Sequence, residues 1–376
     1  MAVSKVGPTG LSSAVGALGK NVIINGAHTI DQRAAETRTG LGAADFRIDD
    51  QWELISAGSS SSRWTASVET AAGPRDNSKW LKLLCTTGDA SPGAAEAAYI
   101  RHVIEGQQGQ SLMNTATTGV RDMTVSMYFI ASLASGSFPA KVCISFATFD
   151  GTGRQFLSDQ SITAASTWQK ISFTIPADAT AELANDTGAG AAIVIGLVGG
   201  SNSVAAEGWS ANATDFITSN TQNWGATADN FIGYTDVQLE PGPVATDFER
   251  EDFGVTYLKC KRYLPFYFDA ANNGNFRFAF GAAYSTSYFQ CILPFLVPPR
   301  AAVTISVDSI GNWRAETGDG TGITVTAIAT QPSVNADNFG MWSTANFQSS
   351  SGYTAKEPGF LRPNGTSGIM IASCEL

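Results

Sequence analysis

The chain has 376 residues, enough for two ordinary domains that each bury their own core. Its net charge of −10, with only 23 basic residues, argues against a general phosphate-binding surface and against charge-driven adhesion to anionic lipid. No segment approaches the roughly 20 apolar residues of a membrane span. We therefore expect no nucleic-acid binding and no membrane insertion, and we expect neutral or weakly charged ligands.

Residues 1–20 carry small side chains without strong periodicity and predict an N-terminal arm or adaptor. In residues 21–246, short segments alternate apolar and polar side chains, as in Met123–Phe129 and Ile171–Ile175. Ala191–Val198 is a continuous apolar run, as in a central strand. Strands separated by turns, without helices between them, predict an antiparallel β-sandwich.

Residues 247–265 predict an extended linker and one short helix. Within the helix, expected over Val255–Leu264, Tyr257, Leu258 and Leu264 have a spacing suited to packing. Residues 266–376 again alternate as strands and predict a second β-sandwich. Pro294, Pro298 and Pro299 predict that their region lies at an edge, because proline cannot donate a ladder hydrogen bond. The expected fold is all-β: two antiparallel, jelly-roll-like β-sandwich domains joined by the linker and the helix.

Residues 236–263 resemble a junction found in tailed-bacteriophage tail-fibre and virion proteins, which typically reads QLE-x-G-x-VAT-x-FE-x-RPYG followed by LALCQRYY. The residues that fall on this pattern are Gln238-Leu-Glu240, Gly242, Val244-Ala-Thr246, Phe248-Glu249, Gly254, Cys260 and Arg262-Tyr263. The chain departs from the pattern at Glu251–Phe253. Residues 21–33 also resemble the opening segment of these proteins.

Three segments near the end of the first domain follow the order found in carbohydrate-binding jelly-roll modules, and the chain resembles those modules there. The segments are Trp168–Pro176, Ala191–Val198 and Asp229–Glu240.

The two resemblances together imply a virion protein of a tailed phage, in a tail fibre or tail tip, made in the host cytoplasm. They imply a homotrimer that contacts other tail proteins through its arm and attaches to host-surface polysaccharide without enzymatic activity. The alternative is a purely architectural virion component, such as a tail hub or a head or capsid fibre, that binds no glycan.

Candidate glycan-binding residues lie in two aromatic stretches rich in Ser, Asn and Gly, residues 199–230 and residues 335–353. Residues 199–230 form the longest stretch without a strand pattern, and such loops are often functional. Three interpretations remain open for these side chains: sugar stacking, subunit contact and plain packing. The candidates are Trp209, Phe216, Trp224, Trp342 and Tyr353.

Catalytic motifs are scarce. The sequence contains no HExxH, P-loop or GxGxxG motif, and its two histidines, His28 and His102, have dissimilar neighbours. A polysaccharide hydrolase would need only two carboxylates, which makes it the less favoured third hypothesis. We expect no cofactor. Asp49 and Asp50 are candidate ligands for a structural calcium ion, and the alternative is a solvated turn.

Overall fold

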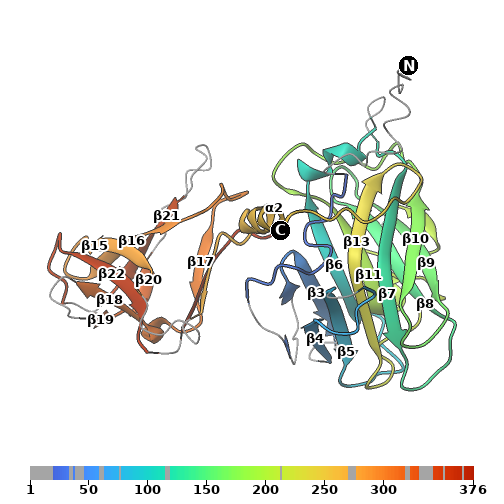
Figure 1. Ribbon diagram of the computed structural model, residues 1–376, viewed down its shortest axis with the longest axis horizontal. Helices are drawn as coiled ribbons and strands as arrows, with labels where there is room; N and C mark the ends of the chain where they lie inside the picture. The colour runs from blue at the N-terminus through green and yellow to red at the C-terminus, as the bar shows by residue number, and fades with distance from the viewer. Residues whose placement is uncertain are drawn as a thin grey trace, which may run out of the picture. The chain divides into compact units, whose positions relative to one another are not determined.

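The computed structural model describes residues 20–33, 37–38, 46–58, 63–75, 78–114, 119–211, 214–269, 277–317, 322–329, 342–349, 352–365 and 368–376. The predicted arm lies outside this part of the chain, except for Lys20. The chain divides into two compact units, residues 1–253 together with Leu376, and residues 254–375. Antiparallel strands dominate both, which confirms the predicted all-β fold (Figure 1).

The N-terminal unit is a sandwich of two antiparallel sheets. Sheet A has the order β1-β4-β5-β13-β7-β10, with bounds β1 Thr37–Arg38, β4 Trp64–Glu69, β5 Trp80–Cys85, β13 Phe231–Pro241, β7 Met123–Ser132 and β10 Gln169–Ile175. Sheet B has the order β12-β9-β8-β11-β6-β3-β2, with bounds β12 Gly208–Ser210, β9 Arg154–Ile162, β8 Ala140–Thr148, β11 Ala189–Gly199, β6 Ala97–Glu105, β3 Trp52–Ala57 and β2 Phe46–Asp49. In the described part of this unit, 3-10 helices span Gln108–Leu112 and Ser201–Ser203.

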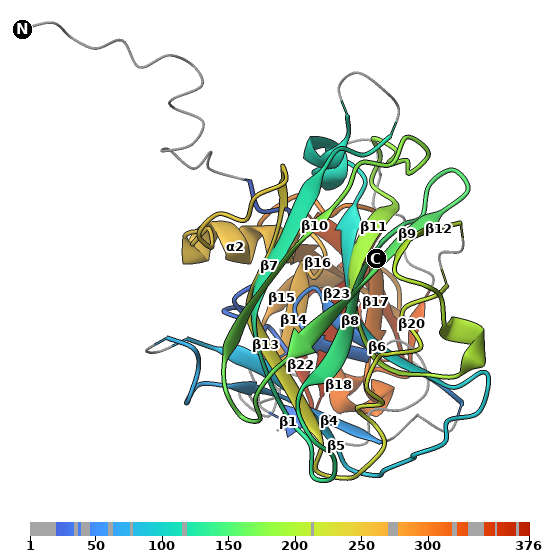
Figure 2. The same cartoon turned by 90° about the vertical axis from the view of Figure 1, so that its right-hand side faces the viewer.

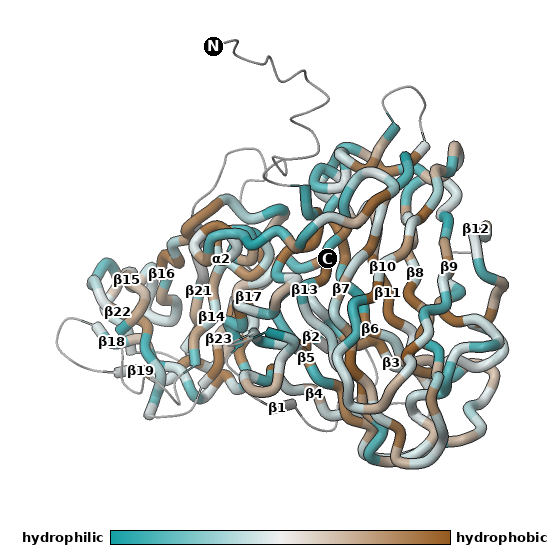
Figure 3. Tube along the Cα trace, turned by 45° about the vertical axis from the view of Figure 1, so that its right-hand side comes forward, coloured by the Kyte–Doolittle hydropathy of each residue, from teal (hydrophilic) through white to brown (hydrophobic). Residues whose placement is uncertain are grey.

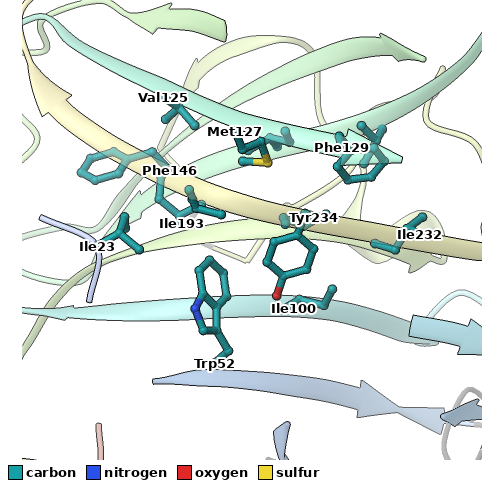
Figure 4. Packing of buried hydrophobic residues seen from close by; sticks show 14 of the residues in the cluster. Ile23, Trp52, Ile100, Val125, Met127, Phe129, Phe146, Ile193, Ile232 and Tyr234 are labelled. Carbon is teal, nitrogen blue, oxygen red and sulfur yellow. The ribbon is translucent and has the colours of Figure 1, made fainter. Parts of the chain in front are cut away.

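The core lies between the two sheets, where one face of each strand is apolar. Met123, Val125, Met127 and Phe129 of β7 point into it and are buried, as their alternation predicts. Trp52 and Tyr234 meet them from the other strands (Figure 4). Figure 3 shows the hydrophobic residues in brown along the strands of this unit. Burial of this apolar set is the main stabilising term for the sandwich.

The C-terminal unit packs a three-stranded sheet and a seven-stranded sheet around a second core. The smaller sheet has the order β14-β23-β17, with bounds β14 Phe266–Asp269, β23 Ile369–Ser373 and β17 Thr304–Val307. The larger sheet has the order β19-β18-β22-β15-β16-β21-β20, with bounds β19 Gly322–Thr324, β18 Trp313–Thr317, β22 Pro358–Pro363, β15 Ala279–Ala283, β16 Tyr288–Pro294, β21 Trp342–Gln348 and β20 Ala327–Ala329. The 3-10 helix Ile310–Asn312 precedes β18.

Two local predictions for this unit were wrong. β16 is not an edge strand but lies between β15 and β21, because Pro294 is its last residue and disturbs only the end of the ladder. Helix α2 spans Phe253–Lys261, and Leu258 is 42% exposed on it. The helix instead buries Thr256, Cys260 and Lys261, and a buried Leu264 follows it. No helix in the described part of the chain combines the length and apolar character that crossing a bilayer requires.

Candidate functional site

The aromatic residues of the predicted 199–230 site turn mostly inward. Trp224 is fully buried in the core between the sheets, and its backbone N–H donates to the Leu197 carbonyl oxygen (3.0 Å). Phe216 is 5% exposed and packs against Tyr99, with 4.4 Å between ring centroids. The prediction that these two rings stack on sugar is therefore wrong for this structure. The segment folds back over sheet B because it contributes apolar side chains that cover the outer faces of β6 and β11.

Trp209 is half-buried at the edge of the sandwich. Its ring lies 5.5 Å from the ring of Phe156, and its Nε1–H donates to the carbonyl oxygen of Pro176 (2.9 Å). The Arg154 guanidinium lies 5.9 Å from the ring centroid. These contacts occupy the edge and part of the faces of the Trp209 ring, which lies between β9 and the end of β10. Packing therefore explains the position of Trp209.

The two candidates of the C-terminal unit, Trp342 and Tyr353, do not form a site among the described residues. Tyr353 is 3% exposed and lies against Phe289, with 6.0 Å between ring centroids, so its ring is part of the second core and that prediction was wrong. Trp342 begins β21 opposite Pro294, but its side chain lies outside the described residues.

The candidate calcium ligands serve the protein itself. Asp49 accepts hydrogen bonds from Nδ1–H of His28 (2.7 Å) and from the side-chain amide of Asn25 (3.2 Å). Asp50 accepts one from the backbone N–H of Gln32 (3.0 Å), and its other oxygen lies 3.6 Å from the Arg33 guanidinium. Both are buried rather than in a solvated turn. Among the described residues, no group of three or more His, Cys, Asp and Glu side chains is arranged to hold a metal ion.

The two histidines, distant in sequence, meet in the core. Trp52 lies between them, at 5.6 Å from the ring of His28 and 5.1 Å from that of His102. Both histidines are fully buried, and burial lowers the pKa of each to about 3. At neutral pH they are uncharged, and His28 donates to Asp49. With no solvent-exposed surface, these rings have a structural role.

A pocket of about 240 Å³ opens on the outer face of sheet A, which we call the sheet-A pocket. Strands β7, β10 and β13, which lie side by side in Figures 1 and 2, form its floor. The loop between β4 and β5 and the linker after β13 form its walls. The lining residues are Arg75, Ser126, Met127, Tyr128, Lys170, Asp236, Asp247 and Phe248.

An ion pair between a buried carboxylate and a partly exposed arginine fixes one side of the pocket. Asp236 is 2% exposed and pairs with Arg75, and Arg250 lies 3.9 Å from the same carboxylate oxygen. The Arg75 guanidinium also covers the Tyr128 ring, 5.5 Å from its centroid. Burial and the neighbouring Arg250 lower the pKa of Arg75, which remains a cation at neutral pH because an arginine pKa starts so high. The pair thus holds Tyr128 and Arg75 in defined positions.

The position of Asp236 depends on a local break in β13. The register between β13 and β7 shifts between Thr235 and Gln238, which marks a β-bulge, and Asp236 has a left-handed φ of +54°. Aspartate tolerates this conformation better than most residues. In an unbroken strand, Asp236 would point into the core like Tyr234, two residues before it. The bulge directs its carboxylate to the outer face instead.

The opposite wall depends on the residues of the junction motif in 236–263. Gln238 and Glu240 point outward from β13, and the linker folds back over them: Thr246 N–H donates to Glu240 Oε1 (2.8 Å), and Glu249 N–H donates to Gln238 Oε1 (2.8 Å). The Thr246 hydroxyl donates to the second Glu240 oxygen (2.7 Å). The QLE and VAT-x-FE elements therefore form a clamp that places residues 247–248 against the pocket.

Two charged groups that line the pocket, Lys170 and Asp247, form no salt bridge within the described part of the chain. Lys170 is exposed and lies directly opposite Tyr128 in the β10–β7 register. The Asp247 side chain is exposed across from it. Together with Arg75 and Asp236, they give the pocket two cations and two anions, a balance suited to an uncharged, hydroxyl-rich ligand. Trp168, two residues before Lys170, is half-buried and makes an edge contact with Trp80 at 5.3 Å.

The sequence pattern does not reveal this pocket. Its alternation placed Tyr128 and Lys170 on the outer face of their strands, but nothing in the pattern shows that a bulge, a loop and a linker converge there. The available signal was the alternation of polar and apolar residues in Asp236–Glu240, at the start of the junction motif.

No protein-family model and no curated protein matches the sequence. Several solved structures are similar to it in part. A CBM4 module has 15% identity over 58% of this chain and 99% of its own, with a TM-score of 0.28. The N-terminal cellulose-binding domain of Cellulomonas fimi β-1,4-glucanase C has 15% identity over 56% and 97%, also with a TM-score of 0.28. The family 11 carbohydrate-binding module from Clostridium thermocellum, in complex with a β-1,3-1,4-mixed-linked tetrasaccharide, has 10% identity over 55% and 99%, with a TM-score of 0.27. At these identities and TM-scores, the likeness assigns no ligand to this chain.

Proposed function

We propose that this chain is a non-enzymatic, glycan-binding component of a tailed-phage virion, in a tail fibre or tail tip, that attaches to host-surface polysaccharide. The observation that carries the binding part of the proposal is the sheet-A pocket. It combines an aromatic ring at Tyr128 with charged groups of both signs, and these can donate to and accept from sugar hydroxyls.

The size and charge of the pocket support a single uncharged sugar residue as its occupant. Its volume of about 240 Å³ lies below the roughly 300–1,000 Å³ of pockets that bury drug-sized ligands. The balanced charge of the pocket offers no net attraction to a polyanion, and the chain as a whole carries −10. Weak single-site binding is compatible with attachment, because multivalency raises avidity by about 10²–10⁴.

The virion part of the proposal is supported by the junction motif, whose residues clamp the linker to sheet A. A homotrimer that contacts other tail proteins through the N-terminal arm belongs to the same proposal. Labelling of phage particles with an antibody against the chain tests it: signal on a tail appendage is expected, and labelling confined to infected-cell lysate outside particles would contradict it.

Binding is tested by measuring association of the purified protein with a panel of bacterial surface polysaccharides, beside Tyr128→Ala and Lys170→Ala variants. We expect saturable binding to one class of glycan and about tenfold weaker binding in each variant, which corresponds to about 1.4 kcal/mol. Phe149→Ala is the control, because Phe149 is 38% exposed and does not line the pocket. Reducing-sugar release during the incubation would contradict the non-enzymatic assignment.

A purely architectural virion component is the second candidate. The observation that favours it is a row of large apolar side chains exposed on the C-terminal sheet, as interfaces between proteins often have. Absence of binding to every glycan of the panel by a correctly folded protein would favour this candidate.

A further inference from the structure

Three large apolar side chains lie in one row on the outer face of the seven-stranded sheet. Phe280 of β15 is directly opposite Phe360 of β22 on one side and Ile292 of β16 on the other. They are 40–58% exposed, and the two phenylalanine rings make an edge contact at 5.6 Å. Because β22, β15 and β16 are central strands, this apolar row lies in the middle of the sheet rather than at its rim (Figure 1).

The apolar row contributes little to the core of its own unit. The same strands supply the core with their other face, through the buried residues Ala279, Phe289, Cys291 and Leu361. An antiparallel sheet with one solvated face normally alternates apolar residues inward and polar residues outward. Large apolar side chains grouped on the outward face, rimmed by polar residues, mark an interaction surface.

A basic rim borders the apolar row on β18 and β22. Glu316, directly opposite Phe360, pairs with Arg277 and with Arg362. The hydrogen bond from Arg277 lowers the pKa of Glu316, although burial opposes the shift, so the carboxylate stays ionised. Arg314 lies opposite Arg362, against the backbone of Gly322, and no ion pair of Arg314 is found in the described ranges. Three arginines and one glutamate give this rim a net charge of +2.

The charge of the chain is divided unevenly between its two units. Residues 254–376 contain eight basic and seven acidic residues, a net charge of +1. Because the whole chain carries −10, residues 1–253 carry −11. A basic-rimmed apolar surface is therefore complementary to the N-terminal unit of the same protein.

We propose that the apolar row and its basic rim bind a second copy of this chain, with the acidic N-terminal unit of that copy as the partner surface. Two identical rims brought face to face would place arginines against arginines, which disfavours a contact between two such sheets. The contact is therefore heterologous, and contacts of this kind close into rings or continue as filaments. This inference is independent of glycan binding.

Sedimentation velocity of the full-length protein over a wide range of concentrations tests the proposal. We expect the sedimentation coefficient to rise with concentration and the association to weaken as NaCl is added, because exposed charges are screened. The double variant Phe280→Ser, Phe360→Ser should remain a monomer under conditions in which the wild type associates. Leu296→Ser removes an exposed apolar side chain of the C-terminal unit that lies outside the apolar row, and this variant should associate like the wild type.

A second variant keeps the test decisive if the double variant loses its fold, which a thermal melt detects. Arg314→Glu leaves the apolar row intact and should weaken association at low salt. A wild-type protein that remains monomeric throughout would overturn the proposal. So would association that either folded variant leaves unchanged.

Discussion

The buried histidines predict a specific loss of stability in mild acid. Burial lowers the folded-state pKa of His28 and His102 to about 3, whereas each has a value of 6.5 when exposed in the unfolded chain. The unfolded state therefore binds these protons first as the pH falls. The stability that the two neutral rings provide is fully present above pH 6.5 and is lost as the pH falls from 6.5 towards 3.

The size of the effect follows from the two pKa values. At pH 5 an unfolded histidine is almost fully protonated and the buried one is not, which costs about 2 kcal/mol per residue relative to pH 7. For His102 this cost is a substantial part of the roughly 5–15 kcal/mol that stabilises an ordinary domain, and His28 shifts the stability in the same direction. Ordinary carboxylates titrate near pH 4 and therefore contribute less to the change in stability between pH 7 and pH 5.

Urea unfolding followed by tryptophan fluorescence at pH 7 and pH 5 measures this loss. The signal comes mainly from the N-terminal unit, which holds six of the eight tryptophans. The variant His102→Gln replaces the ring with an amide that does not titrate, so the loss between pH 7 and pH 5 should fall by about 2 kcal/mol whatever the variant's stability at pH 7. A loss equal to that of the wild type would refute the reasoning.

Three further predictions follow from the packing. Trp224→Ala should lower the free energy of unfolding by about 3–5 kcal/mol, because it empties a fully buried site; a loss below 1 kcal/mol in urea unfolding would place the ring at the surface. Gly233→Ala should lower the free energy of unfolding by about 1–3 kcal/mol, because the added Cβ would lie 2.4 Å from the Trp80 ring. Gly311→Ala, whose Cβ meets nothing within 4 Å, is the control, and equal melting temperatures for the two variants would contradict the prediction. EDTA should leave the melting temperature unchanged, because protein donors already bind Asp49 and Asp50; a fall restored by calcium would show a structural ion.

The strand pattern was predictable because burial on one face imposes a period of two. The segment Met123–Phe129 is an example, since its apolar residues all point into the core. The role of Pro294 was not predictable from the residue alone, because a proline at the last position of a strand has the same sequence signature as one on an edge. Leu258 is exposed because the helix is anchored around Cys260, a choice that tertiary packing makes.

The candidate site was harder to predict because aromatic residues have the same composition signal whether they stack on a ligand or fill a core. Trp224 and Phe216 lie in a polar loop, yet both are buried, because that loop folds back onto the sandwich. The sheet-A pocket combines residues 75, 128, 170, 236 and 247, and only a bulge in β13 and the clamped linker bring them together. The junction motif gave only a resemblance, and its structural role follows from the hydrogen bonds that Gln238 and Glu240 make with the linker.

A crystal structure of the protein with an oligosaccharide from the best-binding polysaccharide of the panel tests the central claim most directly. The account predicts one sugar residue in the sheet-A pocket, in contact with the Tyr128 ring and within hydrogen-bonding distance of Lys170 or Asp247. An oligosaccharide bound on another face, with the sheet-A pocket empty, would contradict it.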